Sequence, residues 1–141
     1  MEFVNYQPTK IIFGENKVDS LHKYVLPYGK KVFVIGPILC EPLKPLLSRL
    51  EKALINEVSF HTFYEVESNP STKTVDTALT IMRDFKPDII VGIGGGSVID
   101  VSKICSILYN NPNYTWNYLF STFDDFRTSY EEIRNKLPVI V

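Results

Sequence analysis

The pattern of hydrophobic and polar residues along the chain changes repeatedly between two types, one typical of strands and one typical of helices. Three runs rich in β-branched or aromatic residues, at 32–35, 58–64 and 89–93, predict buried strands. Between and after these runs, apolar residues recur at helical spacing, which predicts helices from Asn16, over 44–54, after Ser71 and up to Asn110. Strands that alternate with helices predict an α/β fold with a Rossmann-like parallel sheet and helices on both faces.

The two ends of the chain add further predictions. The β-prone runs 3–6 and 10–13 predict an N-terminal β ribbon at a sheet edge. Residues 137–141 predict the start of another strand. The aromatic segment before them predicts only local packing around Trp116 and a helical turn over 130–135.

Composition narrows the class of protein. The 141 residues are 45% hydrophobic with a net charge of −1, so we expect one domain and no nucleic-acid partner. No apolar segment is long enough to span a membrane and the start does not resemble a signal peptide, which predicts a cytoplasmic protein without a membrane partner. Cys40 and Cys105 are expected to be reduced thiols, and His22 and His61 to be surface or packing residues. No catalytic constellation and no metal-ligand set is apparent.

The most informative stretch is the glycine turn after the third strand run. Gly94, Gly95 and Gly96 lead directly into a helical pattern. Glycines let the backbone approach a ligand, and the unpaired N–H groups at a helix start favour an anion, so this turn predicts a phosphate site. A tight turn that binds nothing explains the same pattern. Gly36 and Pro37 end another strand and are expected at the same ligand-binding edge.

Polar residues near these turns have two interpretations each. Ser97 and Asp100 have capping-box spacing, or else Ser97 donates to a phosphate and Asp100 faces the rest of the ligand. Lys103 is placed to pair with Asp100 on the helix surface. Asn69, held out of helical geometry by Pro70, either presents its amide to a ligand or serves the turn.

Four segments resemble the iron-containing alcohol dehydrogenases in order and spacing: 10–14, 31–35, 67–70 and 94–103. The last is the most specific. The resemblance implies an N-terminal α/β domain that binds NAD or NADP. It also implies a separate C-terminal helical domain that holds iron or zinc, and hydride transfer between the nicotinamide and a small alcohol or aldehyde.

Carried over residue by residue, the resemblance implies that Gly95, Gly96 and Ser97 meet the pyrophosphate. Asp100 would lie near the nicotinamide and Asn69 would line the cofactor cleft. NAD-preferring members often have an aspartate where Pro37 stands, so the absence of a carboxylate permits and favours NADP. The expected cofactor-binding residues are Gly36, Pro37, Asn69, Gly94, Gly95, Gly96, Ser97, Asp100 and Lys103.

The family's metal-binding domain has no counterpart in these residues, so residues 1–141 are expected to be an NAD(P)-binding domain that does not turn over an alcohol by itself. Apolar surface near 137–141 is expected to favour self-association. Two alternatives stay open. Glycerol dehydrogenases and 3-dehydroquinate synthases have a similar glycine-rich turn, and a stand-alone nucleotide-binding module without catalysis fits the same features.

Overall fold

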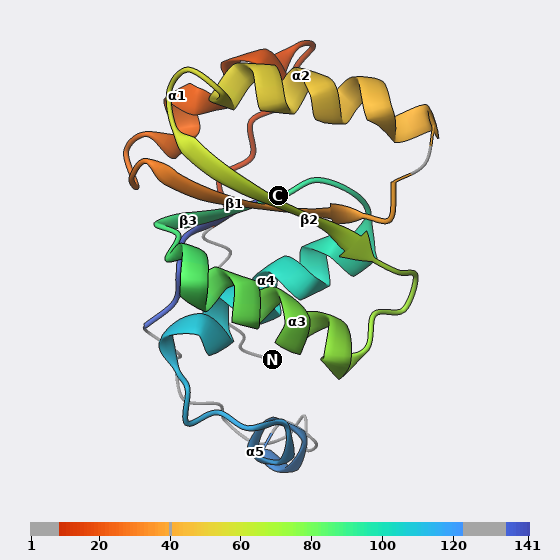
Figure 1. The fold of residues 1–141 in the computed structure, drawn as a ribbon, viewed down its shortest axis with the longest axis vertical. Helices are drawn as coiled ribbons and strands as arrows, with labels where there is room; N and C mark the ends of the chain where they lie inside the picture. Colours follow the sequence, from red (N-terminus) through yellow and green to blue (C-terminus); the bar gives the residue numbers. More distant parts are fainter. Residues whose placement is uncertain (1–8, 40, 123–134) are drawn as a thin grey trace, which may run out of the picture.

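The computed structural model describes residues 9–39, 41–122 and 135–141. Its elements are η1 (Lys17–Ser20), α1 (His22–Val25), β1 (Lys31–Pro37), η2 (Glu41–Leu43), α2 (Lys44–Leu54), β2 (Ser59–Val66), α3 (Thr72–Phe85), β3 (Ile89–Gly92), α4 (Gly96–Asn110), α5 (Trp116–Thr122) and β4 (Val139–Ile140). The strands form one parallel sheet in the order β2-β1-β3-β4. Helices α1 and α2 lie on one face and α3 and α4 on the other (Figure 1). The predicted Rossmann-like α/β fold is therefore confirmed.

Strand β1 lies between two hydrophobic cores, one on each face of the sheet. Val32 and Val34 belong to the core beneath α2, whereas Phe33 and Ile35 belong to the core beneath α3 and α4. All four side chains are fully buried. Because both faces of the strand are covered, its sequence is a continuous apolar run instead of an alternating one.

The predicted helices over 44–54 and after Ser71 are confirmed as α2 and α3. Ser71 is the N-cap of α3, where its hydroxyl accepts from the Thr74 N–H at 3.4 Å. Each helix buries one apolar stripe against the sheet and exposes its polar face. The buried residues are Leu47, Leu50 and Leu54 in α2 and Val75, Ala78, Leu79 and Met82 in α3.

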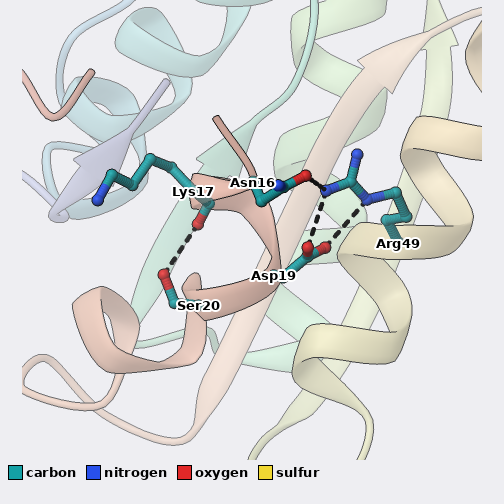
Figure 2. A network of polar contacts seen from close by, with 5 residues as sticks. All are labelled: Asn16, Lys17, Asp19, Ser20 and Arg49. Carbon is teal, nitrogen blue, oxygen red and sulfur yellow. Dashed lines mark hydrogen bonds and ion pairs between the residues drawn. The ribbon is translucent and has the colours of Figure 1, made fainter. Parts of the chain in front are cut away.

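The helix predicted from Asn16 is two short turns, η1 and α1, which bury Leu21 and Val25. Arg49 of α2 holds η1 from outside: its guanidinium donates to Asp19 at 2.8 and 3.0 Å and to Asn16 at 2.8 Å (Figure 2). These hydrogen bonds keep the pKa of Asp19 below its ordinary value. Because the pair is exposed, it orients η1 on α2 more than it stabilises the fold.

Residues 10–13 do not form the predicted strand. Ile11 and Phe13 are 81% and 97% exposed, and no described strand pairs with them. A β-prone sequence becomes a strand only when a partner supplies the hydrogen bonds of the ladder. The ribbon prediction is therefore wrong for 10–13, and its other half, 3–6, lies outside the described residues.

The strand predicted over 137–141 is confirmed as β4, which pairs in parallel with β3. The Leu137 N–H donates to the Ser106 carbonyl at 2.9 Å, and the Ser106 hydroxyl donates back to the Leu137 carbonyl. Local aromatic packing is also confirmed, since Trp116 stacks on Phe120 with ring centroids 6.0 Å apart. Most of the helical turn predicted over 130–135 lies outside the described residues.

Cys105 and His61 agree with the predictions of a reduced thiol and of a surface or packing histidine. Cys105 is a free, fully buried thiol, and burial raises its pKa to about 12. Cys40 lies outside the described residues. The His61 ring stacks on Phe33 with centroids 5.8 Å apart. No helix in the described part of the chain is long and apolar enough to cross a membrane.

Candidate functional site

The carboxyl ends of the neighbouring strands β1 and β3 lie side by side, and the connections that follow them lead to opposite faces of the sheet (Figure 1). Ile35 pairs with Gly92, and the Ile93 N–H donates to the Ile35 carbonyl at 2.8 Å. From β1 the chain continues towards α2 on one face, and from β3 it continues into α4 on the other (Figure 1). Open α/β sheets bind ligands beyond the strand ends at such a switch point.

Gly94 begins the glycine turn in a conformation that other residues rarely adopt, with φ 158°. A Cβ at Gly94 would lie 2.7 Å from Val98 Cγ2 and 3.4 Å from Pro37 Cδ. The missing side chain therefore lets the turn pass close to the end of β1. The structure thus brings Gly94 and Pro37 together, as the sequence predicts.

Gly95 and Gly96 face open space. A Cβ added to either glycine would meet no atom within 4 Å. Gly95 is the N-cap of α4, and its carbonyl accepts from the N–H groups of Val98 and Ile99 at 3.1 Å. The N–H groups of Gly95, Gly96 and Ser97 bond to none of the described residues. Free donors at the positive end of a helix, beside empty space, fit a phosphate or pyrophosphate group.

The capping-box interpretation of Ser97 and Asp100 is wrong. Helix α4 begins at Gly96, so Ser97 is its second residue, and no side chain caps the helix. A capping box requires the serine at the N-cap position, which Gly95 occupies here. Among the described residues the first N–H groups of α4 are therefore left for another group.

Asp100 and Lys103 are exposed on the outer face of α4, opposite the buried Val98, Val101 and Cys105. They follow Gly96 by one and two helical turns on the same face. Among the described residues they form no ion pair, so the predicted surface pairing is absent. Their part in cofactor binding stays a prediction.

Gly36 is a glycine for a packing reason that the sequence does not reveal. A Cβ at this buried position would lie 2.6 Å from Cδ1 of the Tyr64 ring. The Tyr64 hydroxyl donates to Glu51 Oε1 at 3.1 Å, and burial raises the pKa of Tyr64. Pro37 follows at the end of β1, half-buried, with exposed Ile38 after it. No carboxylate stands at this strand end.

Asn69 lies in the loop after β2 at the same edge of the sheet. Val66 ends β2 opposite Pro37, and its carbonyl accepts from the Ile38 N–H at 3.1 Å. Three residues further on, Asn69 is exposed and has a left-handed backbone with φ 53°. The prediction that Pro70 keeps Asn69 out of right-handed helical geometry is confirmed.

Glu67 has a role that sequence reasoning missed. Its carboxylate accepts from the Thr74 hydroxyl at 2.6 and 2.8 Å and from the Ser71 N–H at 3.0 Å. These hydrogen bonds, with that of Thr74 the strongest, lower the pKa of Glu67 to about 2. The available signal was an acidic residue four positions before a helix-capping serine.

A second hollow lies at the opposite end of α4 from the glycine turn. A cavity of about 220 Å³ is bordered by α3, by the C-terminal end of α4 and by Trp116, whose indole N–H donates to Asp76 at 3.0 Å. No sequence-predicted site residue lines it. Among the described residues, no group of three or more histidine, cysteine or acidic side chains is placed to hold a metal.

Known proteins resemble this chain in sequence and in fold. NADH-dependent butanol dehydrogenase A of Clostridium acetobutylicum is 31% identical over 113 residues, which cover 78% of this chain and 28% of that protein. Aldehyde-alcohol dehydrogenase 2 of Entamoeba histolytica is 33% identical over 122 residues, covering 85% and 14%. A crystal structure of an iron-containing alcohol dehydrogenase from Thermotoga maritima matches with a TM-score of 0.75 at 30% identity, covering 95% and 35%.

The chain therefore spans between 14% and 35% of the lengths of these relatives. A family model described as iron-containing alcohol dehydrogenase matches residues 8–141, nearly the whole chain. The matched segment includes both strand ends, the Asn69 loop and the glycine turn. On this evidence the chain belongs to the iron-containing alcohol dehydrogenase family.

Proposed function

We propose that this chain is the NAD(P)-binding domain of an alcohol dehydrogenase, and that it binds the dinucleotide at the carboxyl edge of its sheet. The observation that carries the proposal is the open start of α4. There the N–H groups of Gly95, Gly96 and Ser97 are unbonded among the described residues and face space that a side chain would otherwise occupy.

In this proposal Gly95, Gly96 and Ser97 hold the pyrophosphate. Pro37 borders it from the end of β1, and Asn69 approaches from the loop after β2. Asp100 and Lys103 extend the site along the exposed face of α4. The negative charge of the ligand is balanced mainly by backbone N–H groups and the helix dipole.

The bound dinucleotide supplies a nicotinamide that exchanges hydride with the carbon of an alcohol, giving an aldehyde or ketone, NAD(P)H and a proton. The role of the described residues is to bind and orient the cofactor for that reaction. No metal chemistry is assigned to them, because they gather no metal-ligating cluster. Iron or zinc belongs to the complete enzyme in this proposal.

Both dinucleotides are proposed to bind. The Clostridium acetobutylicum relative is named as NADH-dependent, which supports NAD. The lack of a carboxylate at Pro37 and Ile38 supports NADP, because nothing there repels a 2′-phosphate. A small alcohol or aldehyde as substrate comes from the names of the relatives. The cytoplasmic location and self-association stay predictions.

Calorimetric titration of the 141-residue chain with NADH, NADPH and ATP tests the proposal. We expect binding of at least one dinucleotide, with no alcohol oxidation by the chain alone. Binding of ATP without either dinucleotide would indicate a nucleotide-binding module of another kind. Absence of any dinucleotide binding would contradict the proposal.

A further inference from the structure

The loop between β2 and α3 is closed by one side chain. The Glu67 carboxylate spans the loop, accepting from the Ser71 N–H at 3.0 Å and from the Thr74 hydroxyl at 2.6 and 2.8 Å. One acceptor group thus bonds to both the N-cap residue and the first turn of α3. The intervening residues 68–70 are left as a short outward turn.

Asn69, at the centre of that turn, has a backbone in the left-handed region. Its φ of 53° is unfavourable for residues other than glycine, although asparagine tolerates it better than most. The Asn69 side chain is exposed and makes no hydrogen bond to a described residue. Among the described residues the amide therefore has no partner, and it is available to a ligand.

The turn starts beside the glycine site. Val66, the last residue of β2, pairs with Pro37, and Pro37 is the neighbour of Gly94. The start of α3 and the start of α4 thus lie at the same edge of the sheet. A group that fixes the Asn69 turn also fixes the position of a polar side chain relative to the phosphate donors.

We propose that Glu67 is a positioning residue, which holds the Asn69 turn in its binding conformation through Ser71 and Thr74. This inference rests on the proposed dinucleotide function and adds a residue to its site. Without the carboxylate, the turn would have to be ordered when the ligand binds, and that ordering weakens affinity.

Matched substitutions test the role. Glu67→Gln replaces the charged acceptor with a neutral amide that has a single acceptor oxygen, and Thr74→Val removes the hydroxyl donor. The control Thr77→Val removes a hydroxyl that donates to the Lys73 carbonyl at 2.9 Å on the same helix. We expect the first two to raise the NADH or NADPH dissociation constant about fivefold and the control to leave it unchanged.

If Glu67 acts by positioning Asn69, the loss of dinucleotide affinity in Glu67→Gln depends on the Asn69 side chain. In an Asn69→Ala background, Glu67→Gln should cause no further loss of affinity, because the group that it positions is gone. A general loss of stability would instead weaken binding equally in both backgrounds. Equal affinity of Glu67→Gln and the unaltered chain, or fully additive losses, would overturn the positioning role.

Hydrogen exchange tests the turn without any ligand. The Ser71 amide should exchange faster in Glu67→Gln and Thr74→Val than in the unaltered chain and in Thr77→Val. Unchanged exchange at Ser71 would overturn the inference by itself. Failure of the unaltered chain to bind either dinucleotide would contradict the proposed function, whereas normal binding by Glu67→Gln would contradict only the positioning role.

Discussion

Two strand-to-helix junctions at the same edge of the sheet differ in whether their backbone N–H groups are hydrogen-bonded. At the start of α3, the Ser71 hydroxyl accepts from the Thr74 N–H and Glu67 accepts from the Ser71 N–H. At the start of α4, Gly95 is the N-cap, and no side chain of the described residues bonds to the free donors. A helix start that is closed by its own side chains is structural, whereas an open one is available to an anion.

The comparison also separates two uses of glycine. Gly94 is needed because its backbone has a positive φ and passes close to Val98. A Cβ added to Gly95 or Gly96 would meet no atom within 4 Å, so packing within the described chain does not explain these two glycines. Glycines that the fold itself does not need point to a ligand that approaches the backbone closely.

The largest expected effect comes from closing the open junction. Gly95→Ser gives α4 a capping hydroxyl in space that is empty, so stability should be unchanged or rise by a few tenths of a kcal/mol. The new side chain occupies the phosphate position, and the affinity for NADH or NADPH should fall at least about tenfold. Calorimetric titration beside urea unfolding measures both. Retained affinity would show that the open donors do not bind the dinucleotide.

The next effect comes from opening the closed junction. Ser71→Ala removes the N-cap of α3 and should lower the free energy of unfolding by about 1 kcal/mol. Ser48→Ala, at an exposed position inside α2, is the control and should not destabilise the fold. Urea unfolding followed by circular dichroism compares the two. Equal stability would mean that the cap, at 3.4 Å, contributes nothing.

The smallest effect concerns the charge of Glu67. Its pKa is lowered from 4.5 to about 2 in the folded chain, so the ionised carboxylate stabilises the fold above about pH 4.5. This contribution should diminish as the pH falls through 4.5 and be lost near pH 2. Urea unfolding of the unaltered chain and of Glu67→Gln should therefore converge at acid pH. A difference that does not depend on pH would contradict the role of the charge.

Much of the architecture is predictable because its signals are local. The buried runs of β1 and β3 are apolar and β-branched, and the helical stripes of α2 and α3 recur at the expected spacing. Secondary structure follows from such periodicity when burial agrees with it. Residues 10–13 show the limit, because their strand propensity is real but no described strand pairs with them.

The sequence by itself determined the parallel α/β order, the position of the glycine turn and the likeness of its residues to one family. Only the tertiary structure decided that Gly95 and not Ser97 caps α4, that Gly36 is a glycine because of Tyr64, and that Glu67 accepts from Ser71 and Thr74 across the loop. Those features depend on which backbone donors remain unpaired and on contacts made across strands and loops. The pattern of residue types along the chain does not show which backbone N–H groups find a partner in the folded protein.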